Sequence, residues 1–346
     1  MNVSKNRGDD EEIRVDVDTG PEKKEETQAK EATYGLAASL VLVSLYVGLW
    51  TAEGLIIYSA RDVDFDRASV TLAVEIFKMV VASSLYFSHG GSVEQFKQYF
   101  GRASIFAVPA LVYTLYNLVR YFALTIADPG TYRVLINARI AFSGILFQIF
   151  FHKQLGQRKW IALVALTLGC AIMKWGEPLQ LAATPLLVIG FQALLGSLGG
   201  VYNEVALKRD MKLDINLQNM YLYIFTISLN IATIFVKTLF RPDSGFLFRN
   251  WSLSVMGPMV LLGGGGGFMT ALLLKHLNVL IKEFANGAEM LLSALFSNIL
   301  FGVPLNAQVF AAIFVVSGSV IMYYWERIQP SLQANASSSS SSSSTK

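Results

Sequence analysis

The 346-residue chain is poor in cysteine, histidine and charge, and each shortage excludes a class of protein. Its one cysteine, Cys170, allows neither an internal disulfide nor a cysteine-based zinc site. The three histidines fall near predicted helix ends, so we expect no metal site and no cofactor. Charged residues make up only 15% of the chain, and a net charge of +3 gives no basis for binding nucleic acid. Soluble globular proteins are about a quarter charged, so the deficit points to a membrane.

Motifs of common enzymes are also missing. The chain has no P-loop, no nucleophile elbow of the Gly-x-Ser-x-Gly type, no His-Glu-x-x-His and no paired-carboxylate motif. An ATP-driven pump or a hydrolase of the soluble type therefore has no support, and we expect a protein that is not an enzyme. Residues 1–32 are charged and hold no apolar stretch, so no cleavable signal peptide is visible and the first apolar run is expected to act as a signal anchor.

Apolar residues, by contrast, fill 53% of the chain, and the mean hydropathy is +0.46. A membrane-spanning helix needs about 20 mostly apolar residues. The sequence predicts an all-α polytopic membrane protein with ten transmembrane helices, at 34–60, 69–88, 104–127, 130–151, 159–176, 184–207, 216–239, 253–275, 278–301 and 307–325. Lys and Arg near the span ends are about twice as frequent on the side that holds both termini, which predicts cytosolic termini.

An internal repeat divides the predicted helices into two units. With an offset of 149, Leu146 and Phe147 fall on Leu295 and Phe296, and Gly169 falls on Gly318. Five helices in each unit force opposite orientations, and such inverted repeats are typical of secondary transporters. We therefore predict a single transporter domain with these parts: a disordered cytosolic tail at 1–33, repeats at 34–176 and 177–326, and a cytosolic, serine-rich, unstructured tail at 327–346.

Polar side chains recur at helical spacing inside several spans. They are Lys282, Asn286 and Glu289; Tyr132 and Arg139; and Tyr113, Asn117 and Arg120. Arg139 lies about 14 Å into its span, too deep for its charge to reach the headgroups easily, whereas Lys282 lies about 6 Å deep and could snorkel. Two cations with tyrosines and asparagines suit an anionic ligand that carries phosphate and a ring.

Other features have a structural interpretation that stands beside the functional one. The glycine runs at 196–200 and 263–267 let helices or a ligand approach closely, and ordinary tight helix packing is the more common case. Glu75 and Lys78 are spaced to form a simple i, i+3 pair. Glu289 is a candidate internal partner of a cation.

Four sequence blocks resemble the nucleotide-sugar transporter family, in its branch for CMP-sialic acid, UDP-galactose and UDP-N-acetylglucosamine within the drug/metabolite transporter superfamily. The resemblance runs from about residue 36 to 325, with the blocks in the family's order. The blocks are "VEIFK" (74–78), "YTLYNLVRYFALTIADPGTYRVLINARI" (113–140), "GGVYNEVALK" (199–208) and "KHLNVLIKEFA" (275–285).

The resemblance implies an antiporter that exchanges a cytosolic nucleotide sugar for a lumenal nucleoside monophosphate by alternating access. It implies that the protein is located in the Golgi membrane, with the ER membrane as the other option. It also implies contact with membrane lipid, and it leaves open whether the protein forms a homodimer. The substrate-binding residues it implies are Arg139 and Lys282 for phosphate, with Tyr113, Asn117, Tyr132, Gly200, Asn219 and Tyr223 at nucleotide-facing positions.

Several positions depart from the family pattern, so the sugar and the base stay open. The departures are Arg139 for a lysine, Glu283 for a glycine, Asn278 for an aspartate, Leu118 for an asparagine, Ile136 for a tyrosine and Asn137 for a glutamine. The roles of Glu53, Glu283 and Glu289 also stay open. A second hypothesis is a proton-coupled exporter of small metabolites in which Glu53, Glu75 and Glu289 carry protons, and a third is a membrane scaffold that transports nothing.

Overall fold

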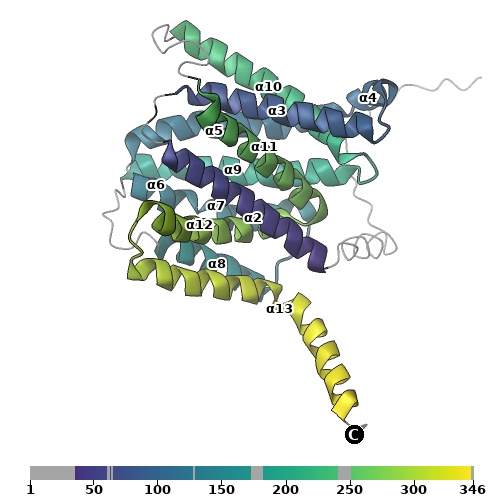
Figure 1. Cartoon of the computed structure of the whole chain (residues 1–346), viewed down its shortest axis with the longest axis vertical. Helices are drawn as coiled ribbons and strands as arrows, with labels where there is room; N and C mark the ends of the chain where they lie inside the picture. The colour runs from purple at the N-terminus through teal and green to yellow at the C-terminus, as the bar shows by residue number, and fades with distance from the viewer. Residues whose placement is uncertain are drawn as a thin grey trace, which may run out of the picture.

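A computed structural model describes residues 36–60, 63, 65–127, 129–172, 182–240 and 251–343, and the predicted N-terminal tail lies outside them. All regular elements among these residues are helical. In chain order they are α2 (Leu36–Ser59), α3 (Arg67–Ser88), α4 (Val93–Phe100), the 3-10 turn η1 (Ala103–Phe106), α5 (Ala107–Ile126), α6 (Pro129–Ile136), α7 (Arg139–Phe151), α8 (Gln157–Ile172), α9 (Ala183–Arg209), α10 (Ile215–Phe240), α11 (Leu253–His276), α12 (Val279–Phe301) and α13 (Ala307–Ser343). Figure 1 shows them packed side by side.

The predicted all-α polytopic class is confirmed. In the described part of the chain, nine helical stretches are long and apolar enough to cross a membrane. The predicted span at 159–176 is represented by α8, which has 16 residues and ends at Ile172. Residues 173–176, which would complete this span, lie outside the described ranges. The count of ten therefore stays a prediction.

The fourth predicted span is not one continuous helix, and this corrects the sequence interpretation. α6 ends at Ile136 and α7 begins at Arg139. The amides of Asn137 and Ala138 bond to carbonyls three residues back, and Ile140 bonds to Asn137 in the same way. Such tighter 3-10 bonding changes the rotation per residue, so the two helices are not in the phase of one continuous helix. The break before Pro129, which the sequence predicted, is present.

Two segments expected to be irregular contain helices. The polar loop after the second span holds α4, whose N-terminus is capped by Ser92 accepting a hydrogen bond from the amide of Gln95 at 3.1 Å. The serine-rich tail was expected to be unstructured, but α13 continues through Pro330 to Ser343. A helix already formed in a span needs only propagation, which costs less than nucleation. Figure 1 shows this last part of α13 leaving the bundle.

The packing of the helices repeats itself between the two halves of the chain. α7 ends at Phe151 and α12 ends at Phe301, which is an offset of 150 residues (301 − 151). The connection from α7 to α8 has the same length as the connection from α12 to α13. This offset differs by one residue from that read from the sequence. α5 and α7 pack on α9, just as α11 and α12 pack on α2. The opposite orientation of the two halves stays a prediction.

Figure 1 places α3 with α10 along one edge of the bundle and α8 with α13 along the other, and both pairs are in direct contact. The remaining spanning helices lie between these edges. The glycine run of α11 packs here against α2 and α3. A Cβ added at Gly266 would lie 2.9 Å from Cε2 of Trp50, and one at Gly267 would lie 2.9 Å from Cδ of Lys78. Tight helix packing, the more common reading of this run, is what the structure shows.

At one end of α3, Asp66 caps the helix and joins it to α10. Its carboxylate accepts hydrogen bonds from Ser69 and lies 3.5 Å from Nζ of Lys237. Burial alone would raise the pKa of Asp66, but the hydrogen bonds of Ser69 and the charge of Lys237 together hold that pKa below its usual range. The capping carboxylate is therefore ionised at neutral pH.

Candidate functional site

The start of α12 is fixed by two polar contacts, and this fixes Lys282 one turn further on. The side chain of Asn278 accepts a hydrogen bond from the amide of Ile281 at 2.9 Å. The buried carboxylate of Glu204 on α9 accepts the amide of Val279 at 2.6 Å. Both satisfy amides that a helix N-terminus leaves without an intrahelical partner. The "GGVYNEVALK" block thus serves, through Glu204, to anchor the helix that carries Lys282.

Lys208 is a second cation that binds at the contact between α9 and the start of α12. Nζ of Lys208 lies 2.9 Å from Glu204 and also donates to the carbonyl of Leu277, in the link between α11 and α12. The buried carboxylate is therefore paired, which removes most of the penalty of placing a charge inside the protein.

The two predicted phosphate-binding cations meet on one carboxylate, that of Glu283. Nε of Arg139 lies 3.4 Å from one oxygen, and Nζ of Lys282 lies 3.3 Å from the other. Glu283 is only 1% exposed, whereas 31% of the Arg139 side chain is accessible. Lys282, at 13%, points into the bundle instead of toward headgroups. The snorkelling interpretation of Lys282 is therefore wrong, and its carboxylate partner is Glu283.

Three uncharged side chains complete the surroundings of Glu283. Ser143 donates to it at 3.5 Å and the amide of Asn286 at 3.2 Å. Asn286 in turn accepts a hydrogen bond of 2.6 Å from the hydroxyl of Tyr46 on α2. Asn286, which the sequence placed on the ligand-facing side with Lys282, is thus tied to its own helix and to α2. The cluster spans both halves of the chain.

Glycines on α9 bring that helix against the cations and a tyrosine. A Cβ at Gly200 would lie 3.1 Å from Nζ of Lys282, so a larger residue would displace the ammonium. A Cβ at the preceding Gly199 would lie 2.9 Å from Cε1 of Tyr113. The structure therefore places three predicted ligand residues, Tyr113, Gly200 and Lys282, at one stretch of α9.

Tyr132, whose spacing from Arg139 predicted a shared face, lies against α9. Its hydroxyl accepts a hydrogen bond of 2.8 Å from the buried amide of Gln192 on α9. Arg139 pairs with Glu283 on α12. Ser197 on α9 donates to the carbonyl of Arg139 at 2.7 Å and holds the start of α7. Asn117 is half-buried on α5.

Two predicted residues on α10 are buried with polar atoms that lack protein partners. Within the described ranges, neither amide atom of Asn219 has a hydrogen bond, and neither has the hydroxyl of Tyr223. Both residues are at most 2% exposed. Lys78 on α3 lies over the Tyr223 ring, 4.7 Å from its centroid, and pairs with Glu75 at 2.5 Å. Buried polar groups are normally satisfied, so unmet ones indicate room for a polar ligand or water.

Two of the three carboxylates of the proton-coupled alternative, Glu75 and Glu289, have local hydrogen-bond partners. Glu75 pairs with Lys78, as its spacing predicted, and accepts a hydrogen bond of 2.8 Å from Thr226. Glu289 accepts one of 2.8 Å from Ser293. A Cβ at Gly263 would lie 2.9 Å from the carboxylate of Glu53, so α11 packs closely over that group.

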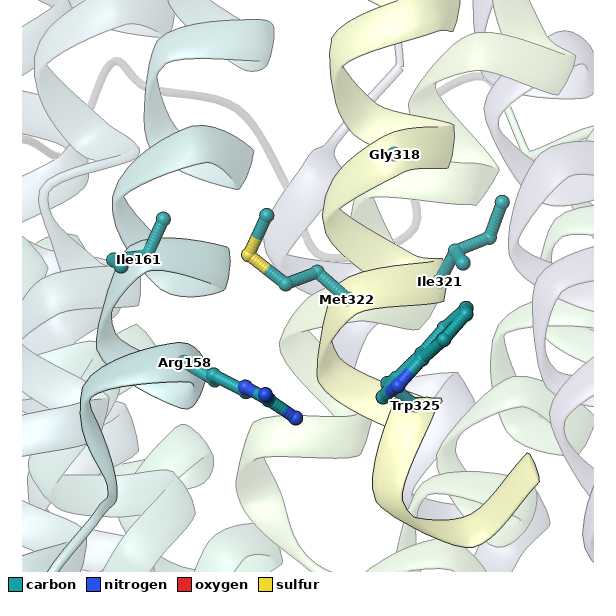
Figure 2. Close-up of a pocket in the computed structure, with 6 residues that line it drawn as sticks. All are labelled: Arg158, Ile161, Gly318, Ile321, Met322 and Trp325. Carbon is teal, nitrogen blue, oxygen red and sulfur yellow. The ribbon is translucent and has the colours of Figure 1, made fainter. Parts of the chain in front are cut away.

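A separate groove lies on the outer side of the bundle between α8 and α13, and Figure 2 shows its lining side chains. It is almost wholly apolar apart from Arg158 at one end, with Trp325 nearby. None of the predicted ligand residues lines it. We therefore take the polar cluster between the helices, and not this groove, as the candidate site.

The cluster can bind an anion through two cationic side chains, Arg139 and Lys282, that differ in geometry. Arg139 offers a planar fork and Lys282 a point charge, as phosphate recognition favours. The sequence alone did not identify Tyr46, Ser143 or Gln192 as members of the cluster. Each is a single polar residue in an apolar stretch, and no spacing distinguishes it.

Comparison with known proteins gives the family. A model of the family described as nucleotide-sugar transporter matches residues 37–324. The UDP-galactose transporter senju of Drosophila melanogaster is 27% identical over 82% of this chain and 86% of its own. CMP-sialic acid transporter 2 of Oryza sativa subsp. indica is 28% identical over 84% and 85%. A probable UDP-sugar transporter protein of Xenopus tropicalis is 24% identical over 90% and 98%.

A crystal structure shares the fold, with a TM-score of 0.65 over 83% of this chain and 96% of its own at 14% identity. The family match covers most of the chain, including every element of the cation cluster. It also contains all eight residues predicted to bind substrate. The chain belongs to the nucleotide-sugar transporter family.

Proposed function

We propose that this protein exchanges a cytosolic nucleotide sugar for a lumenal nucleoside monophosphate by alternating access. The observation that carries the proposal is the meeting of Arg139 and Lys282. They come from opposite halves of the chain, and both lie within 3.4 Å of one buried carboxylate, while 31% of the Arg139 side chain stays accessible. Sites at the interface of two repeats are typical of secondary transporters.

The remaining predicted residues support a ligand larger than phosphate. Tyr113 lies against Gly199 beside the cations, where its ring can stack on a base. Asn219 and Tyr223 supply buried polar atoms that have no hydrogen bond in the described part of the chain. We propose that these three residues, with Asn117, Tyr132 and Gly200, hold the nucleoside part.

For the substrate, we propose a UDP-sugar such as UDP-galactose or UDP-N-acetylglucosamine, or CMP-sialic acid. UDP-galactose and CMP-sialic acid are named as the substrates of similar proteins, at 27% and 28% identity. We further propose a Golgi membrane location, which the family resemblance implies. The distribution of Lys and Arg near the span ends supports a topology with both termini in the cytosol.

Transport into liposomes tests the proposal. Purified protein is reconstituted into vesicles loaded with UMP, CMP or GMP, and uptake of labelled nucleotide sugars is measured without a pH gradient. We expect UMP or CMP inside to accelerate uptake of one or more pyrimidine nucleotide sugars. The proposal fails if no internal monophosphate accelerates uptake of any sugar tested. Uptake or export that requires a pH gradient would support the proton-coupled alternative.

A further inference from the structure

Glu283 is the one charged group of the cluster to which the proposed exchange assigns no task. It is 1% exposed, and it lies behind two cations that are themselves more accessible, Lys282 at 13% and Arg139 at 31%. A phosphate that arrives from the open side would therefore contact the cations first. The carboxylate would remain on their far side.

The contacts of Glu283 are all long. Both ion pairs exceed 3.2 Å, whereas well-formed charged hydrogen bonds are about 2.7–2.9 Å. Ser143 and Asn286 donate at 3.5 and 3.2 Å. Nε of Arg139 makes no hydrogen bond to any described residue. The cations are thus partly neutralised by Glu283 without being held tightly, and they can turn to a ligand without breaking a strong bond.

The net charge of the cluster decides which states of a carrier are accessible. Arg139 and Lys282 together carry +2, and Glu283 lowers this to +1. During alternating access the site must pass through a state closed to water on both sides. Unpaired charges are strongly disfavoured in such a state. A bound phosphate would neutralise the cations, and an empty carrier needs another anion to do so.

We propose that Glu283 is a built-in counter-anion that takes the place of the ligand's phosphate when the site is empty. It thereby allows the unloaded carrier to reorient, so that transport is not limited to one-for-one exchange. This inference rests on the proposed function and adds to it a mode of net transport. It assigns to Glu283 the role of a residue that sets the strictness of coupling.

The same carboxylate must weaken phosphate binding. A nucleoside monophosphate carries close to two negative charges at neutral pH. We take roughly 7 Å between the Glu283 carboxylate and the phosphate, and an effective dielectric constant of about 20. The repulsion of each phosphate charge by Glu283 then corresponds to about a fiftyfold loss of affinity. Solvent beside Arg139 reduces this value. We therefore expect Glu283→Gln to tighten monophosphate binding at least about tenfold and to leave binding of the uncharged nucleoside unchanged.

Transport in liposomes provides the first test. Labelled UDP-galactose uptake is measured into vesicles loaded with UMP and into unloaded vesicles, with CMP-sialic acid and CMP as a second pair. We expect the wild type to take up sugar nucleotide in both, more slowly when unloaded. In Glu283→Gln, the ratio of unloaded to loaded uptake should fall at least about tenfold, because the empty carrier can no longer neutralise its cations.

A matched control is Glu289→Gln, which removes a carboxylate on the same helix that accepts a hydrogen bond from Ser293. Its uptake ratio should equal that of the wild type. If Glu283→Gln is not folded, the double variant Arg139→Lys with Glu283→Gly, compared with Arg139→Lys alone, isolates the effect of the carboxylate. It removes the carboxylate and keeps two cations.

The second test is binding, measured by thermal shift with UMP, CMP and the corresponding nucleosides. It applies whether or not transport is observed. Monophosphate affinity that is unchanged or weaker in the folded variants overturns the role of Glu283, and so does an unchanged uptake ratio. Strict exchange by the wild type, with no unloaded uptake, also overturns it while leaving the proposed function intact. Absence of any exchange overturns the proposed function itself.

Discussion

Replacing Lys282 by alanine separates the ligand-binding role of this lysine from its structural role. The ammonium lies 3.3 Å from Glu283 and beside Gly200, so its removal deletes one of the two cations that face the open side of the cluster. A charged hydrogen bond contributes about 1.5–3 kcal/mol, which corresponds to roughly a tenfold to two-hundredfold loss of monophosphate affinity. Binding of the uncharged nucleoside should hardly change.

The stability of the ligand-free protein should fall by much less. Glu283 would keep Arg139, Ser143 and Asn286 as partners, so the loss should be about 1 kcal/mol instead of the roughly 3–5 kcal/mol expected when a buried charge loses its only partner. The double variant Lys282→Ala with Glu283→Gln should not recover this stability, because Arg139 then loses its carboxylate partner. Its remaining site has the single cation Arg139, so monophosphate binding should stay weaker than in Glu283→Gln alone.

Thermal shift with UMP or CMP and with the matching nucleosides measures both quantities. Lys275→Ala is the control, because Lys275 is a buried lysine with structural partners, the carbonyl of Leu213 at 2.7 Å and Gln218 at 2.8 Å. It should lower the melting temperature without changing the shift caused by monophosphate. A monophosphate shift in Lys282→Ala equal to that of the wild type would refute the phosphate role.

Four further outcomes are expected. Arg139→Ala should abolish exchange in liposomes while Arg139→Lys keeps part of it, because lysine retains the charge but not the planar fork; full exchange by the alanine variant would contradict this. Gly264→Ala should destabilise the protein by about 1–3 kcal/mol, since its Cβ would overlap the Phe77 ring, whereas a Cβ at Gly265 has ordinary contacts and the control Gly265→Ala should be neutral or stabilising in a melting assay. Asn219→Ala should weaken nucleoside binding about tenfold without loss of ligand-free stability, because its buried amide has no hydrogen bond among the described residues; a large drop in melting temperature would show a structural role instead. Antibodies against tags at both termini should bind after selective permeabilisation of the plasma membrane, and lumenal protection of either tag would exclude the predicted topology.

The sequence determined the spans and the depth of the cations. In a bilayer every backbone polar group must be satisfied within its own helix, so apolar runs of sufficient length predict helices whatever their neighbours are. Pro129 predicted the break before α6 for an equally local reason, the missing amide. The same locality explains why Arg139 and Lys282 could be selected as candidates before their surroundings were known.

Tertiary structure decided which of these residues meet. The spacing of Tyr132 and Arg139 predicted one face, but it did not predict their partners, which are Gln192 on α9 and Glu283 on α12. Glu283 follows Lys282 in the chain, yet its ion pair with Arg139 depends on how α7 and α12 are rotated against each other. Helical periodicity gives the face of a side chain and not the neighbour across from it, so the partners in this cluster became visible only once the helices were packed.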